Sequence, residues 1–69
     1  MAEKWHDPAQ WIFPSIGTYR LTKLADNEGA YHLWRYELSS WLFVRVEHDP
    51  RLDAEHHYLG EDDEYTYWK

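Results

Sequence analysis

Alternation of apolar and polar residues predicts three consecutive β-strands in the middle of the chain. Residues 18–24 alternate with a period of two and are rich in β-forming types. Similar runs cover residues 30–38 and 41–47. The stretch 26–29, Asp-Asn-Glu-Gly, has the composition of a turn, because Asp and Asn favour turns and glycine accepts positive φ. We therefore predict an antiparallel meander of three strands.

The same period of two sorts the aromatic side chains onto two faces of the predicted sheet. Trp34 and Tyr36 share one face of their strand. With strict alternation, Trp41 and Phe43 fall on the opposite face of the sheet. A small sheet cannot bury both sets, so one set is expected to form the core and the other to stay exposed. The pattern leaves open which set is which.

A short helix is predicted after the third strand. Asp49 and Pro50 provide a helix cap followed by a proline at the first helical position, and Gly60 stands where a helix would end. Between these signals, Leu52 and His56 are four residues apart and share a helical stripe with residue 59. We therefore expect a helix within residues 50–59, with His56 as a partly buried packing residue.

The two ends of the chain carry weaker signals. At the C-terminus, residues 64–69 alternate Tyr65 and Tyr67 with Thr66 and Trp68, which predicts a fourth strand at an edge of the sheet. At the N-terminus, residues 5–8 favour a turn or short helix, and an apolar cluster follows at 11–13. The predicted fold class is α+β, a small antiparallel meander sheet of three to four strands with one short helix.

The size of the chain limits it to a single domain, residues 1–69. Its 69 residues include no cysteine, which excludes disulfides and thiolate sites. A chain this short buries only about 60% of its unfolded surface, so a second subunit would help it, and a homodimer is a possible state. No apolar run approaches a membrane span and no signal peptide is evident, so we expect a soluble, cytoplasmic protein.

The charge divides the chain into a neutral aromatic body, residues 1–46, and an acidic region, residues 47–69. Through residue 46 five basic and five acidic residues cancel, so the acidic region holds the whole net charge of −6. Its acidic residues are Glu47, Asp49, Asp53, Glu55, Glu61, Asp62, Asp63 and Glu64. Tyr58, Tyr65, Tyr67 and Trp68 lie among them in the sequence. We take these twelve residues as candidates for binding a partner.

The spacing of these carboxylates suggests partial mimicry of a nucleic-acid backbone. Carboxylates on one side of an extended chain lie about 6–7 Å apart. Duplex DNA presents one charge per about 1.7 Å of its axis. The alternative is a solvated acidic face that maintains solubility. Direct binding of nucleic acid is not expected, because the chain has no basic run to neutralise phosphates.

Signals for catalysis are missing from the sequence, and the signal for metal binding is weak. No nucleophile elbow or phosphate-binding glycine loop is present, so we predict no enzyme and no cofactor. Asp53 and His57 would share a helical face, and His48 or Asp49 could join them around Zn²⁺. An i, i+4 pair more often only supports a helix, and we predict no metal site.

The predicted function is that of a non-enzymatic acidic interaction protein. We expect an inhibitor that occupies the basic, nucleic-acid-binding surface of a partner protein. Compact, acidic, cysteine-free chains resemble phage-encoded inhibitors of host nucleic-acid enzymes, including anti-CRISPR proteins and DNA mimics, and this resemblance implies the host cytoplasm. Two alternatives stay open: a small aromatic-rich module that binds a ligand or carbohydrate, and a homo-oligomeric structural or assembly component.

Overall fold

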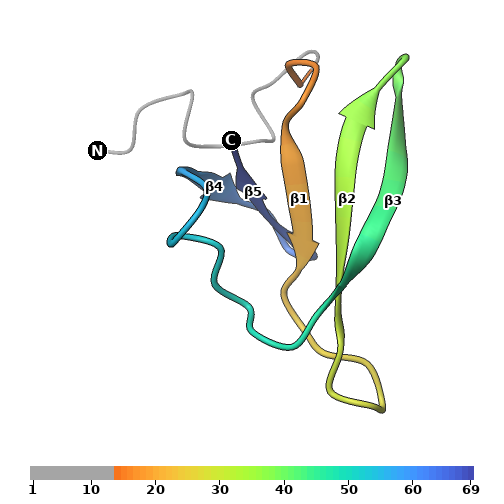
Figure 1. Ribbon diagram of the computed structural model, residues 1–69, viewed down its shortest axis with the longest axis vertical. Helices are drawn as coiled ribbons and strands as arrows, with labels where there is room; N and C mark the ends of the chain where they lie inside the picture. The colour runs from red at the N-terminus through yellow and green to blue at the C-terminus, as the bar shows by residue number, and fades with distance from the viewer. Residues whose placement is uncertain (1–13) are drawn as a thin grey trace.

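The computed structural model describes residues 14–69, which form one antiparallel sheet of five strands (Figure 1). The strands are β1 (Tyr19–Thr22), β2 (Tyr31–Glu37), β3 (Ser40–Glu47), β4 (Tyr58–Glu61) and β5 (Tyr65–Trp68). Their order in the sheet is β3-β2-β1-β5-β4, which places β3 and β4 at the two edges. The end of the chain therefore pairs with its first described strand, with Tyr19 opposite Trp68.

The predicted meander is confirmed in strands β1 to β3. At the β1–β2 turn, the Asp26 carboxylate accepts hydrogen bonds from the backbone N–H of Glu28 at 2.8 Å and of Ala30 at 3.0 Å. Gly29 has a φ of 78° there, in the left-handed region that glycine tolerates. The β2–β3 turn is made by Leu38 and Ser39, both with positive φ, as in the mirror-image turns that suit tight hairpins.

The α+β assignment with one helix is wrong, because residues 14–69 form no helix. The predicted helix is a loop with a single turn, in which Leu52 C=O accepts from the N–H groups of Glu55 and His56 at 3.0 and 2.8 Å. His57 exchanges two backbone hydrogen bonds of 2.8 Å with Lys69, which draws the chain into an extended conformation. Only residues 51–56 remain between Pro50 and this pairing, too few for a stable helix.

The sheet also differs from the prediction in its last two strands. The chain adds a strand that was not predicted, β4, and Gly60 lies inside it opposite Tyr67 rather than at a helix end. The predicted C-terminal strand exists as β5 but lies between β1 and β4, not at an edge. The features predicted for residues 5–8 and 11–13 lie outside the described residues. Within residues 14–69, no helix has the length and apolar character needed to cross a membrane.

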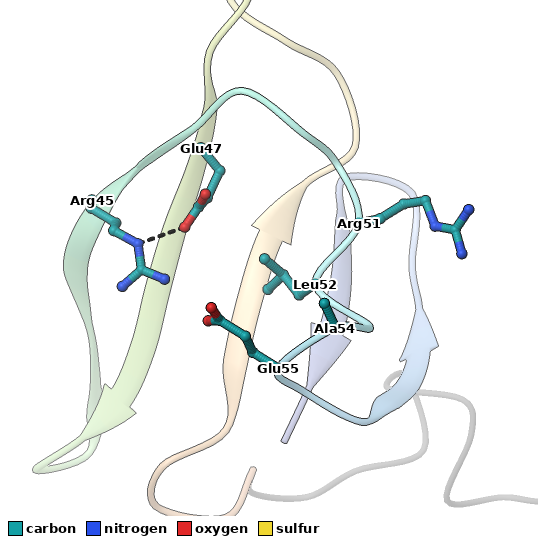
Figure 2. Close-up of a pocket in the computed structure, with 6 residues that line it drawn as sticks. All are labelled: Arg45, Glu47, Arg51, Leu52, Ala54 and Glu55. Carbon is teal, nitrogen blue, oxygen red and sulfur yellow. Dashed lines mark hydrogen bonds and ion pairs between the residues drawn. The ribbon is translucent and has the colours of Figure 1, made fainter.

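The hydrophobic core lies on one face of the sheet, which we call the core face. Leu21 and Leu33 are fully buried there and pack with Trp68 and with Leu52, which comes from the loop between β3 and β4. Figure 2 shows Leu52 on this loop in front of β1. His56 of the same loop packs against Tyr19, with ring centroids 4.6 Å apart, so its predicted packing role is confirmed. The loop takes the place that the helix was expected to fill.

Candidate docking face

The sheet face opposite the core gathers aromatic rings around one arginine. Arg20 of β1 lies opposite Trp34 of β2 and opposite Tyr67 of β5 in the strand registers. Alternation along β1 directs Arg20 away from the buried neighbour Leu21. We call this surface the aromatic face, and its members are Arg20, Trp34, Tyr36, Trp41, Phe43, Tyr65 and Tyr67.

The register of the β2–β3 hairpin places two of these rings on the aromatic face. The tight turn at residues 38–39 sets Tyr36 opposite Trp41 and Trp34 opposite Phe43, and residues directly opposite each other point to the same side of a sheet. Phe43 consequently meets Trp34 edge-on, with ring centroids 5.3 Å apart. The prediction that set Trp41 and Phe43 on the face opposite Trp34 and Tyr36 is therefore wrong. A β-bulge at Val44 acts only further along β3, where it shifts the pairing of residues 45–47.

Arg20 is held against three aromatic rings. Its guanidinium carbon lies 4.1 Å from the ring centre of Tyr65, 4.5 Å from that of Trp41 and 5.3 Å from that of Trp34. Cation–π contacts of this kind contribute about 0.5–2 kcal/mol depending on solvation. Arg20 Nε and Trp34 Nε1 are buried without a hydrogen-bond partner in the described part of the chain. Buried N–H donors normally find an acceptor, so these two are exceptions within the described residues.

The turn between β4 and β5 is fixed by the carboxylate of Asp62. Its Oδ1 accepts from the backbone N–H groups of Glu64 and Tyr65 at 2.9 and 2.8 Å, and its Oδ2 accepts from the Tyr67 hydroxyl at 2.6 Å. Burial alone would raise the pKa of Asp62, but these hydrogen bonds outweigh it and lower the pKa below its ordinary value. The acidic stretch 61–64, which we call the acidic turn, is therefore an ordered structure.

The four carboxylates of the acidic turn have different roles. Glu61 forms a 2.6 Å ion pair with Lys23 and accepts the Tyr58 hydroxyl at 2.8 Å, and the Lys23 ammonium lowers the pKa of Glu61. Asp63 and Glu64 are exposed, and their side chains have neither a hydrogen bond nor an ion pair within residues 14–69. The turn therefore engages two carboxylates within the chain, Asp62 half-buried and Glu61 in an exposed ion pair, and leaves two available to a partner.

A shallow hollow of about 360 Å³ joins the acidic turn to the aromatic face. The residues that line it are Arg20, Asp62, Asp63, Glu64, Tyr65 and Tyr67. It combines flat rings, one cation held by those rings, and exposed carboxylates. Such a surface can receive cationic side chains, which are attracted both by carboxylates and by the faces of aromatic rings.

The other acidic residues lie around the loop on the core side. Glu47 pairs with Arg45, and Asp53 pairs with Arg51. A second hollow of about 360 Å³ lies here, lined by Arg45, Glu47, Arg51, Leu52, Ala54 and Glu55 (Figure 2). Its charges are mixed, and Arg51 points away from the rest in Figure 2. The eight carboxylates therefore do not form one surface.

Asp49 and Glu55 differ from their paired neighbours. Within the described residues, the Asp49 side chain makes a single hydrogen bond, which Oδ1 accepts from the backbone N–H of Arg51 at 3.0 Å. Glu55 is exposed and has an oxygen 4.0 Å from His56 Nε2. Within residues 14–69, neither side chain pairs with a lysine or arginine. Both therefore keep their charge exposed, but on the loop that covers the core.

The four aromatic candidates are also divided by the sheet. Tyr65 and Tyr67 belong to the aromatic face. Tyr58 lies on the other side against Trp68, with ring centroids 5.2 Å apart, and burial together with its bond to Glu61 raises the pKa of Tyr58 to about 12. Trp68 is buried in the core, so we leave it out of the docking face.

Arg20, Trp34, Trp41 and Phe43 enter the site without having been candidates. Alternation along the strand places Arg20 on the sheet face opposite that of Leu21. Only the pairing of β1 with β2 and β5 brings aromatic rings close to Arg20 from both sides. Within residues 14–69, no three His, Cys, Asp or Glu side chains are grouped so as to hold a metal ion. In comparisons with known proteins, no family model, no curated protein and no solved structure matches the chain.

Proposed function

We propose that this chain is a non-enzymatic interaction protein that occupies a basic surface of a partner protein, docking through the acidic turn and the aromatic face. The observation that carries the proposal is the Asp62-fixed turn, which holds Asp63 and Glu64 exposed beside a ring-lined hollow. An ordered turn loses little backbone freedom on binding, so more of the attraction between its exposed carboxylates and a cation appears as affinity.

The aromatic face supplies the second half of such an interface. Tyrosine and tryptophan are enriched at the centres of protein interfaces, where they act as anchors surrounded by polar groups. Here Trp34, Trp41 and Tyr65 are partly exposed and already hold one guanidinium, that of Arg20. Arginine and lysine side chains of a partner would meet rings and carboxylates at the same place. Nucleic-acid-binding proteins present many arginine and lysine side chains on their surfaces, which supports the proposal that this chain inhibits a protein of that class.

The internal ion pairs shape the form of inhibition that we propose. Glu47, Asp53 and Glu61 are already paired with cations of this chain. Two pairs of exposed carboxylates have no lysine or arginine partner within residues 14–69, one on the loop over the core and one in the acidic turn. The pair in the acidic turn is the one that lies beside the aromatic face. The proposed inhibitor therefore blocks a basic groove at a few points, instead of matching the phosphates of a DNA backbone one by one.

The test compares two double variants that change the net charge equally. Asp63→Asn with Glu64→Gln removes the unpaired exposed charge of the acidic turn, whereas Asp49→Asn with Glu55→Gln removes exposed charge from the loop over the core. Each protein is used as bait in pull-downs from lysate at a low and a high salt concentration. At low salt, the wild type and the loop variant should recover bound partner proteins, whereas the turn variant should recover none. High salt should reduce the amount of partner that the wild type and the loop variant recover. Equal recovery by the two variants would contradict docking through the turn.

A small-molecule or carbohydrate-binding module is the second candidate. It is favoured by the hollow of about 360 Å³ beside Tyr65, which falls within the usual volume range of ligand sites. Sugars stack on exposed rings without needing charge, so binding would be insensitive to salt. Titration of tryptophan fluorescence with simple sugars, at both salt concentrations, separates this candidate from the charge-driven one.

A further inference from the structure

Strand β3 forms an exposed apolar edge of the sheet. It is an edge strand of eight residues, and no strand of the described chain pairs with its outer side (Figure 1). Four of its apolar side chains are well exposed: Leu42 (46%), Phe43 (51%), Val44 (39%) and Val46 (44%). A long, apolar edge strand offers its free N–H and C=O groups to another strand.

The usual protections against edge pairing are weak in β3 and stronger in β4. The sequence of β3 contains no proline, lysine or glycine, and its one irregularity is the bulge at Val44. By contrast, β4 has only four residues and is irregular between Tyr58 and Gly60. Both edges carry charged residues and an irregularity, which discourage edge pairing, so their length is the main difference between them. The two edges are therefore unequal, and β3 is the one prepared for a partner.

We infer that the occupant of this edge is the β3 strand of a second copy of the chain. The two charges of β3, Arg45 and Glu47, pair with each other, so the edge is electrically neutral. A basic partner of the kind proposed above has no charge to meet there, whereas an identical neutral, apolar strand is a match. The acidic turn lies on the far side of β2 and β1, so the strongest like-charge repulsion between copies is kept away from the contact.

The small size of the core gives an independent reason for a second copy. In the described part of the chain the buried apolar residues are Leu21, Ala30, Leu33, Leu52, Tyr67 and Trp68. A domain of this size buries a small share of its surface, and association is a common way to complete such a core. Pairing at β3 removes further apolar area from water.

Symmetry determines how the two copies meet. A two-fold axis normal to the sheet sets β3 antiparallel to its copy and gives a closed dimer with a self-complementary contact. The same rotation keeps the aromatic faces of both copies on one side. Phe43 and Val46, which lie on that side of β3, then come close to the same two side chains of the second copy in reversed order. The dimer thus carries one continuous aromatic face with an acidic turn toward each end.

The test measures self-association of the full chain by analytical ultracentrifugation, from about 1 µM to about 1 mM. Leu42→Lys with Val46→Lys places like charges at the contact and should raise the dimer Kd at least about tenfold. Ile16→Lys with Leu24→Lys is the matched control: both side chains are exposed and lie outside β3, so the Kd should not change. Hydrogen exchange of the wild type should show protection of residues 40–47 that increases with protein concentration.

Three results would overturn the inference. These are a wild type that stays monomeric throughout, a dimer whose residues 40–47 gain no protection, and double variants that weaken association equally. Hydrogen exchange on the wild type decides the question even if the β3 variant does not fold. The inference is independent of the proposed function, because Asp63→Asn with Glu64→Gln should leave the dimer intact.

Discussion

Replacement of Asp62 by alanine tests whether its carboxylate fixes the acidic turn. The change removes three hydrogen bonds, of which those from Tyr65 N–H and the Tyr67 hydroxyl are partly buried. The Glu64 N–H is exposed and can bond to water instead, so we count only the other two. At about 1 kcal/mol each, the free energy of unfolding should fall by about 2 kcal/mol. For a domain of this size, this corresponds to a melting temperature lower by roughly 8–16 °C.

The pH dependence of this loss identifies the charged form of Asp62 as its source. In the folded protein the pKa of Asp62 lies below its unfolded value, which is about 3.9. Its stabilising contribution is therefore complete above about pH 4 and is lost as the pH falls through the folded-state pKa. Glu61 and Asp26 also have lowered pKa values, but they are common to both proteins and cancel in the difference.

The assay is urea denaturation of the wild type and of Asp62→Ala at pH 7 and at several values below pH 4. Asp63→Ala is the matched control, because its exposed carboxylate lies in the same turn; its effect should stay within about 0.5 kcal/mol. The reasoning is refuted if Asp62→Ala unfolds with the same free energy as the control. It is also refuted if the difference from the wild type does not narrow in acid.

Two further substitutions test the two faces of the sheet. Leu52→Ala should lower the free energy of unfolding by about 3 kcal/mol, because it leaves a cavity at a buried position against Trp68. A loss below about 1 kcal/mol in urea denaturation would show that the loop does not complete the core. Arg20→Met keeps the length of the side chain but removes its charge. It should lower the free energy of unfolding by about 1 kcal/mol and alter the fluorescence of Trp34 and Trp41, and an unchanged emission spectrum would argue against the ring contacts.

Local signals in the sequence were sufficient where neighbouring residues decide the structure. The β1–β2 turn follows from an aspartate that bonds the backbone two and four residues ahead and from a glycine at positive φ. The meander follows because each of its strands pairs with the next along the chain. The predicted helix failed because its capping signals were local, whereas the pairing of His57 with Lys69 is not.

The aromatic face and the acidic turn also depend on contacts between distant residues that the sequence does not reveal. Alternation correctly kept Trp34 and Tyr36 together on one face of β2. It could not be carried across the β2–β3 turn, whose register places Trp41 and Phe43 on the same side. Nor could it reveal that Lys23, far away in the sequence, pairs with Glu61. The sequence therefore overestimated how many carboxylates are available and missed the arginine at the centre of the rings.

By itself, the sequence determined the meander, the β1–β2 turn and the concentration of negative charge after residue 46, because each depends on nearby residues or on simple composition. Only the tertiary structure decided the position of β5 between β1 and β4, the face on which each ring lies, and the division of the carboxylates into paired and exposed groups. The physical reason is that strand pairing joins residues distant in the chain. Because side chains alternate with a period of two, the register of each pairing then decides which side chains share a face.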